Sequence, residues 1–132
     1  MSSSINKATI IGNLGIDPMH GTLDNGTAVA NIRVATTERY RDRSTGELKE
    51  ATEWHNVVLF GRLAEACRRM LRRGTCVYVE GRIRTRRWRG RDGAERYTTE
   101  IVGSVLRVLC GGRDRLGASE PHALAWVAEH GK

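Results

Sequence analysis

Arginines and an aromatic ring alternate along the segment 76–88, and these residue types could bind an anion together with a flat ring system. Side chains of a strand point alternately to its two faces, so Arg84, Arg86 and Trp88 would share one face. An arginine pairs with phosphate whatever the sequence, and an exposed ring stacks on any unpaired base. Because duplex bases are already stacked on each other, this combination favours a single-stranded nucleic acid.

The segment 52–60 offers a second face of this kind. Trp54 and Phe60 have the same parity as Asn56, whereas Val57 and Leu59 point the other way. Each ring on its own could equally pack into a core, because large rings in small proteins are usually at least partly buried. The shared parity of aromatic and basic residues brings the ligand interpretation level with that alternative or ahead of it.

The positive charge is concentrated on two segments that follow one another. The chain has 132 residues and a net charge of +7, and 19 of its 22 basic residues are Arg. Segment 62–73 carries +4 and segment 82–96 carries +5, whereas the last twenty residues are balanced. A solvated face that keeps the protein soluble would explain an ordinary charge run. Clustering on one hairpin instead favours a binding surface for a polyanion.

Several classes of protein are disfavoured by what the sequence contains. A membrane-spanning helix needs about 20 consecutive apolar residues, and the apolar runs here are far shorter. The amino terminus has no apolar segment of the kind that a secretory signal needs. Cys67, Cys76 and Cys110 are odd in number and lie in apolar patterns, so we expect reduced thiols and a cytoplasmic protein. If its polyanion is DNA, we expect it to be nucleoid-associated.

An enzyme is the least favoured class. The sequence has no metal-binding or phosphate-binding motif, and its four histidines are scattered without a partner at a motif spacing. We therefore expect no catalytic residues, no metal and no cofactor.

The pattern of elements predicts an all-β fold with one helix. Leu63, Ala66, Cys67, Met70 and Leu71 form one apolar stripe, which predicts a helix over 62–73 ended by Gly74. Alternation and turn residues predict strands over 5–13, 28–40, 52–60, 76–89 and 96–109, with a tight turn at 90–93. About five strands with a helix between the third and fourth fit a Greek-key barrel, the OB-fold, over residues 1–111. Residues 112–132 would be a short tail, disordered or forming one short helix.

A collinear set of short motifs covers residues 5–110. They are Asn6-Lys7, Ile11-Gly12-Asn13-Leu14-Gly15, Asp17-Pro18, Asn25-Gly26, Ala28-Val29-Ala30-Asn31, Thr45-Gly46-Glu47, Glu53-Trp54-His55, Val57-Val58-Leu59-Phe60-Gly61, Leu63-Ala64-Glu65, Val79-Glu80-Gly81 and Arg84-Thr85-Arg86 with Trp88. Any one of them is weak, but the ordered set resembles the bacterial single-stranded DNA-binding proteins. The resemblance implies an OB-fold that assembles as a homotetramer, binds single-stranded DNA without sequence preference and serves replication, recombination and repair.

The resemblance also implies roles for individual positions. Trp54, Phe60 and Trp88 match base-stacking rings, and Arg62, Arg73 and Arg87 match basic positions along the DNA path. His55 matches an interface position, and Tyr78 is expected in an interface or in packing rather than in stacking. Parity, charge and resemblance together predict a nucleic-acid-binding set of Tyr40, Trp54, Phe60, Trp88, Arg33, Arg43, Arg62, Arg73, Arg84, Arg86 and Arg87.

Two positions depart from the family pattern. Tyr40 stands where the family often has Trp, so we expect stacking there to be retained but weaker. The sequence ends at 129–132 without the acidic, hydrophobic tip that recruits replication and repair enzymes in the family. Recruitment of such enzymes through a tip is therefore not expected. The alternative function is an accessory or mobile-element relative that binds single-stranded DNA or RNA. Trp126 of the tail is interpreted as a packing or unstructured residue rather than a partner contact.

Overall fold

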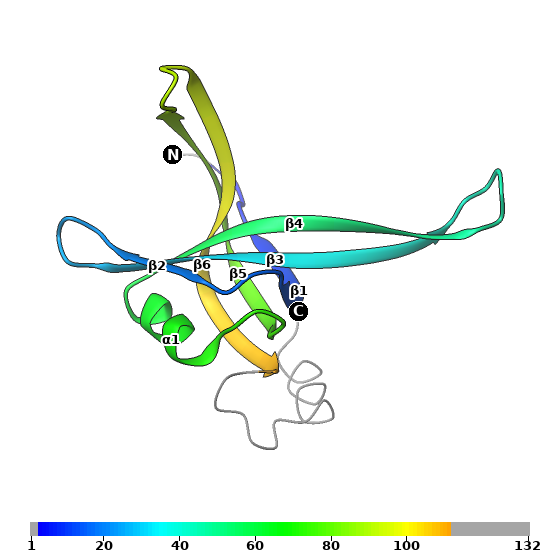
Figure 1. The fold of residues 1–132 in the computed structure, drawn as a ribbon, viewed down its shortest axis with the longest axis horizontal. Helices are drawn as coiled ribbons and strands as arrows, with labels where there is room; N and C mark the ends of the chain where they lie inside the picture. Colours follow the sequence, from blue (N-terminus) through cyan, green and yellow to red (C-terminus); the bar gives the residue numbers. More distant parts are fainter. Residues whose placement is uncertain (1–2, 112–132) are drawn as a thin grey trace.

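The computed structural model describes residues 3–111 as a closed β-barrel with one helix (Figure 1). The sheet order is β1-β5-β6-β4-β3-β2, and an additional pairing of β1 with β3 closes the barrel. This confirms the predicted OB-fold. The elements are β1 (Ala8–Leu14), β2 (Met19–Thr22), β3 (Ala28–Arg41), β4 (Leu48–Phe60), α1 (Arg62–Met70), β5 (Cys76–Arg89) and β6 (Glu95–Cys110).

The structure adds one short strand to those that the sequence predicts. β2 is exposed along all four of its residues and, within residues 3–111, pairs with β3 alone, at the edge of the sheet. Its sequence, Met19-His20-Gly21-Thr22, has no buried face, so no hydrophobic alternation indicates a strand. The helix follows β4 and precedes β5, as predicted once this edge strand is set aside.

Helix α1 is shorter at its carboxyl end than the sequence predicts. It ends at Met70, and Leu71 is already extended. Gly74 takes a positive φ of 93°, but it does so in the turn beyond the helix. Asp17 accepts a hydrogen bond from the backbone N–H of Arg73 at 2.7 Å, so the chain leaves the helix toward the β1–β2 connection.

The core lies between the barrel wall and α1. Its aliphatic side chains come from every strand except β2, and Ala64 and Cys67 of the helix pack against them. Its buried members are Leu14, Ala30, Ile32, Val34, Val57, Leu59, Ala64, Cys67, Leu71, Val77, Val79, Ile101 and Leu106. Burial on this scale, at roughly 1.5–3 kcal/mol for each large aliphatic side chain, supplies the main drive for folding.

Barrel closure depends on a close approach of β1 to β3. Asn13 and Leu14 pair with Ala35 and Val34 at the point where the two strands meet. A Cβ atom at Gly12 would lie 2.2 Å from the carbonyl oxygen of Ala35. Only glycine lets the backbones come this close, so Gly12 is required by closure rather than by a turn.

Two long hairpins project from the barrel (Figure 1). The β3–β4 ladder continues outward to the pair Arg41 and Leu48, and the β5–β6 ladder continues to the pair Arg89 and Glu95. We call the outer parts of these hairpins, residues 36–53 and 84–99, the β3–β4 arm and the β5–β6 arm. Most side chains on both arms are exposed, so the arms contribute surface rather than core.

Strict alternation fails at three positions. The pattern of β5 puts Tyr78 on the face opposite Val77 and Val79, yet Tyr78 is also buried, with 2% of its surface exposed. Val58 of β4 is buried as well, whereas Ile83 is 48% exposed although its parity predicts the core. Where a strand runs through the middle of the barrel wall, both of its faces are covered. Where a strand continues beyond the barrel into an arm, both of its faces are exposed.

Candidate nucleic-acid interface

Trp54 lies on β4 beside Gly15, which follows β1, and Arg33 of β3. It is paired with Ala35 and is half exposed, with 50% of its surface accessible. The guanidinium of Arg33 lies 5.3 Å from the ring centroid, within the range of a cation–π contact. A Cβ atom at Gly15 would come within 2.1 Å of the indole, so this glycine makes room for the ring. One edge of the indole is thereby fixed while the remainder faces solvent.

Phe60 ends β4 and is partly covered by an arginine from β5. The guanidinium of Arg84 is 6.0 Å from the Phe60 ring centroid. Arg84 and Arg86 both pair with the carboxylate of Glu100, Arg86 through its Nε at 3.2 Å. Glu100 is 4% exposed, so its negative charge is compensated by these two arginines rather than by water.

Trp88 stands on the β5–β6 arm and is 41% exposed. Its indole N–H donates to the hydroxyl of Thr98 at 2.8 Å, which fixes the orientation of the ring. Arg96, its register partner on β6, has its guanidinium 6.0 Å from the ring centroid. The ring is therefore held in place while its surface stays available.

Trp54, Phe60 and Trp88 lie along two strands, β4 and β5, on faces that meet at Phe60. Trp54 and Phe60 have the same parity on β4 and are about 20 Å apart along the strand. Arg84 extends from β5 to Phe60, and Arg86 and Trp88 follow it on the same face of β5. We call this set, Arg33, Trp54, Phe60, Arg84, Arg86 and Trp88, the aromatic–arginine track.

The other predicted binding residues lie away from the track. Tyr40 is 48% exposed near the end of the β3–β4 arm, where it pairs with Lys49. Its parity places it on the face opposite Arg33 and Ala35, so it does not join Trp54. Arg87 has the opposite parity to Arg86 and Trp88 and lies 3.9 Å from Glu95 across the arm.

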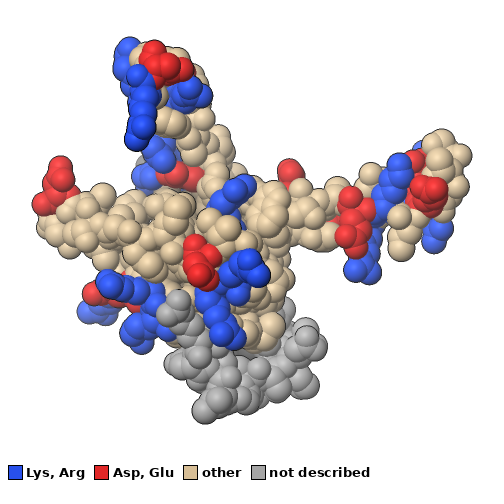
Figure 2. Space-filling view, in the orientation of Figure 1, with Lys and Arg blue, Asp and Glu red and all other residues tan. Residues whose placement is uncertain are grey.

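Three further predicted arginines are exposed at sites that are separate from the track and from one another. Arg43 is in the loop at the end of the β3–β4 arm, Arg62 begins α1, and Arg73 follows the helix. Figure 2 shows Lys and Arg side chains on both arms and around α1, with acidic side chains beside them. The basic surface is thus broader than the track.

Sequence reasoning missed three residues of this surface. Glu100 neutralises part of the charge of Arg84 and Arg86, Arg96 contacts Trp88, and Tyr97 is 66% exposed opposite Arg87. The register of the β5–β6 hairpin, counted outward from its turn, would have identified all three. The burial of Glu100 carries no signal in the sequence, because a glutamate in a strand is expected to face solvent.

The two residues predicted for an interface differ in their surroundings. His55 is half-buried, and its Nε2 lies 2.9 Å from the hydroxyl of Thr36, within hydrogen-bond distance. Tyr78 is buried within the chain, and its hydroxyl donates to Glu80. The Glu80 carboxylate raises the pKa of the Tyr78 hydroxyl, so this group stays protonated. The burial of Tyr78 agrees with a packing role.

Among residues 3–111, no group of three His, Cys, Asp or Glu side chains could hold a metal ion. Burial raises the pKa of the Cys67 thiol to about 12, which leaves it protonated and unreactive near neutral pH. No helix in this part of the chain is long and apolar enough to cross a membrane.

Comparison with known proteins agrees with this geometry. The model of the single-strand binding protein family matches residues 5–109. The chain belongs to the single-strand binding protein family. The family is one of non-catalytic proteins that bind single-stranded DNA.

Two solved structures of single-strand binding proteins are similar to this chain. One is the Plasmodium falciparum protein in complex with single-stranded DNA, with 35% identity, a TM-score of 0.73, and coverage of 82% of this chain and 97% of that one. The other is a deletion mutant of the Thermus aquaticus protein, with 29% identity and a TM-score of 0.70. That match covers 81% of this chain and 51% of the Thermus chain, so this chain spans about half of the longer protein.

Proposed function

We propose that this protein coats single-stranded DNA without sequence preference, using the aromatic–arginine track as its main contact. Trp54, Phe60 and Trp88 stack on bases, and the arginines between them neutralise phosphates. The observation that carries the proposal is the juxtaposition of each ring with a guanidinium, at 5.3–6.0 Å. A stacked base contributes roughly 1–3 kcal/mol, so three rings contribute roughly 3–9 kcal/mol.

The remaining basic positions extend the contact beyond the track. A DNA strand that wraps the molecule would contact Tyr40 and Arg43 on the β3–β4 arm, Arg87 on the β5–β6 arm, Arg62 at the start of α1 and Arg73 in the turn beyond it. Their exposure supports this proposal. Roughly six to eight phosphate contacts would give a log–log salt slope of about −4 to −6 for a single strand.

An oligo-dT titration at several salt concentrations tests this function. Tryptophan fluorescence should be quenched on binding, and affinity should fall steeply with salt. Duplex DNA and RNA are added as competitors. Tight binding with unchanged fluorescence would contradict stacking, equal affinity for duplex DNA would indicate a general polyanion binder, and preference for RNA would favour the alternative ligand.

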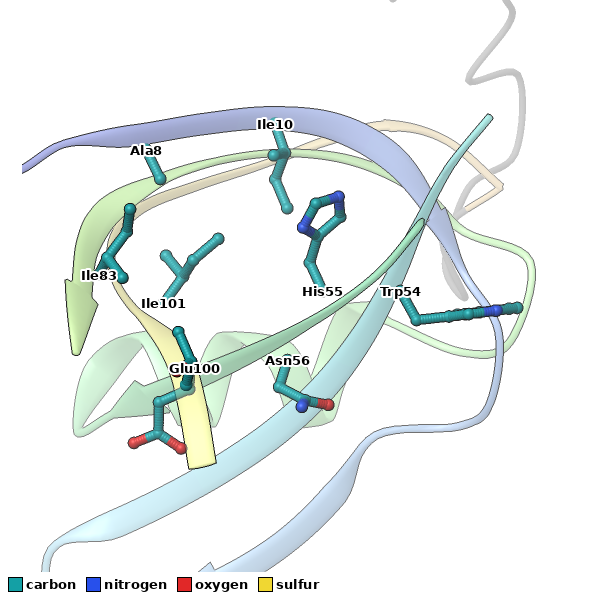
Figure 3. Close-up of a pocket in the computed structure, with 9 residues that line it drawn as sticks. Ala8, Ile10, Trp54, His55, Asn56, Ile83, Glu100 and Ile101 are labelled. Carbon is teal, nitrogen blue, oxygen red and sulfur yellow. The ribbon is translucent and has the colours of Figure 1, made fainter. Parts of the chain in front are cut away.

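We also propose that the chain acts as a homotetramer, as the family resemblance implies. Among residues 3–111, no strand pairs with the edge of β1 from Ala8 to Gly12 on the side away from β5. Beside it, Ile10, Ile83, Ile101 and His55 line an open apolar hollow (Figure 3). A second copy could pair with this edge and cover the hollow. An exposed strand edge beside an apolar surface is a liability for a monomer, which supports assembly.

The biological setting follows from the family. We propose a protein without catalytic activity that protects single-stranded DNA in the cytoplasm during replication, recombination and repair. The tail over 112–132, which includes Trp126 and the expected absence of an acidic tip, lies outside the described residues.

A further inference from the structure

Glu100 is the one charged side chain that is buried among residues 3–111. It lies on β6 opposite Arg84 in the β5–β6 ladder. One carboxylate oxygen, Oε2, accepts from Arg84, including its Nε at 3.1 Å, and the other, Oε1, accepts from Arg86 at 3.2 Å. Both oxygens are therefore engaged, and both partners belong to the track.

The burial of Glu100 gives these ion pairs an unusual weight. Exposed pairs such as Arg39 with Glu50 or Arg87 with Glu95 are screened by solvent and contribute little. A carboxylate that is 4% exposed cannot exchange its partners for water, so removing either arginine would leave a buried charge poorly compensated. Glu100 therefore holds the two arginines more firmly than a surface glutamate would.

Two consequences for binding follow from this geometry. The hydrogen bonds to Glu100 hold the guanidinium of Arg84 at 6.0 Å from the Phe60 ring centroid, so Glu100 determines where Arg84 lies in the track. In addition, two positive charges share one buried negative charge, which leaves about one charge for phosphate.

We propose that Glu100 is a positioning residue that sets the phosphate charge of the track at Phe60. It holds Arg84 and Arg86 in place and reduces their combined contribution from two phosphate contacts to one. This inference rests on the proposed function, because it concerns the same binding surface.

The test is the salt dependence of oligo-dT binding by the Glu100→Gln variant. Glutamine preserves the size of the side chain and removes its charge, so both arginines become available to phosphate. The slope should become steeper by about 0.7, the value of one phosphate contact on a single strand. The ratio of variant to wild-type affinity should then fall about 2.6-fold between 50 and 200 mM salt. A folded variant with the wild-type slope overturns the proposal.

Two further variants test whether the effect comes from the charge at position 100 itself. One changes the length of that side chain, and the other changes the net charge of the protein elsewhere. Glu100→Asp keeps the negative charge and should keep the wild-type slope, and a slope like that of Glu100→Gln would contradict the proposal. Glu65→Gln is the matched control, since Glu65 is exposed on α1 and has no ion pair among residues 3–111. It changes the net charge equally and should leave the slope unchanged, whereas an equal steepening would attribute the effect to net charge.

A double variant that removes one charge of each sign keeps the proposal testable if Glu100→Gln does not fold. Arg84→Gln/Glu100→Gln leaves no buried unpaired carboxylate and leaves Arg86 for one phosphate contact, so the slope should stay at the wild-type value, whereas two independent phosphate contacts in the wild type would make the variant flatter by about 0.7. That flattening would overturn the proposal. Failure of the wild-type protein to bind oligo-dT in a salt-dependent way would instead refute the proposed function, so the two failures are distinct.

Discussion

Trp54 is both a structural and a binding residue. Its indole fills the space above Gly15 and lies 5.3 Å from the guanidinium of Arg33, yet half of its surface is exposed. A ring that is held on one side and open on the other loses little side-chain freedom when a base stacks on it. This preorganisation favours binding without a specific hydrogen-bond pattern.

Replacing Trp54 by Ala should weaken oligo-dT binding by about 1–3 kcal/mol, which is about 5- to 150-fold, because one stacked base is lost. Trp54→Phe keeps an aromatic face and should lose less. Fluorescence anisotropy with labelled oligo-dT measures both. Leu48→Ala is the control, because Leu48 is 62% exposed on the same strand and contributes no ring. Equal affinities for the Ala variant and the wild type would show that Trp54 does not stack.

Asp42 orders the loop at the end of the β3–β4 arm. Its Oδ1 accepts from the hydroxyl and backbone N–H of Ser44 at 2.7 and 2.9 Å, and Lys49 pairs with its Oδ2 at 3.0 Å. These contacts, that with the Ser44 hydroxyl foremost, lower the pKa of Asp42 from 3.8 to about 2. The loop is thus held by the ionised form.

The order of this loop should therefore depend on pH in a defined direction. A carboxyl whose pKa is lower in the folded state stabilises that state fully above pH 3.8, and the stabilisation is lost as pH falls toward 2. NMR signals of Ser44 and Gly46 should shift with a midpoint near pH 2, and Asp42→Asn should abolish that transition. A midpoint near 3.8 in the wild type would contradict the hydrogen-bonded arrangement.

At the scale of elements, close backbone approach decides how the barrel closes. A Cβ atom at Gly12 would lie 2.2 Å from the carbonyl oxygen of Ala35 and 2.9 Å from a Val34 methyl group. Backbone cannot move aside as the end of a flexible side chain can. The β1–β3 contact therefore has no room for a side chain at position 12.

Gly12→Ala should destabilise the protein by at least the 1–3 kcal/mol that is typical of overpacking. Thermal unfolding followed by circular dichroism measures the loss. Gly21→Ala is the matched control, because Gly21 is exposed on β2 and a Cβ atom there would lie 3.5 Å from a Val29 methyl group, an ordinary contact distance. If both variants melt at the wild-type temperature, β1 does not approach β3 as closely as described.

The elements could be predicted wherever an apolar period was present. The stripe from Leu63 to Leu71 predicted α1, and the alternation from Ala28 predicted β3. β2 was missed because no residue of it is buried, and the helix was predicted too long because Arg72 and Arg73 are compatible with a helix while Asp17 and Thr75 draw the chain out of it. Such tertiary contacts have no period in the sequence.

The candidate site was predicted in part for the same reason. Parity placed Arg84, Arg86 and Trp88 on one face of β5, and the ring contacts bring Phe60 to that face. Parity could not predict that the buried carboxylate of Glu100 would pair with two of the arginines. Parity also places Arg87 and Trp88 on opposite faces of β5, although the sequence predicts that both bind DNA. Local alternation identifies faces, whereas burial depends on how the strands are stacked.

At the scale of the molecule, the hollow beside β1 connects the fold to assembly. Its apolar lining includes Ile10, Ile83 and Ile101, with His55, Trp54 and Glu100 beside them (Figure 3). Ile83 is 48% exposed and has the opposite parity to Arg84, Arg86 and Trp88 on β5, whereas Trp54 of the track also lines the hollow. A second copy seated on this hollow would therefore lie next to the track at Trp54 and leave its β5 residues uncovered.

A charge placed in this hollow should therefore separate the subunits. We expect the wild-type protein to be a tetramer at micromolar concentration by native mass spectrometry, and Ile83→Glu to shift it toward smaller species because a carboxylate would be buried without a partner. Met19→Glu is the control, since Met19 is 56% exposed on β2, outside the hollow. Ile83→Glu should still quench with short oligo-dT, because each copy keeps its own track, but long oligo-dT should bind more weakly than to wild type. A monomeric wild type, or an Ile83→Glu variant that remains tetrameric, would show that this hollow is not an interface.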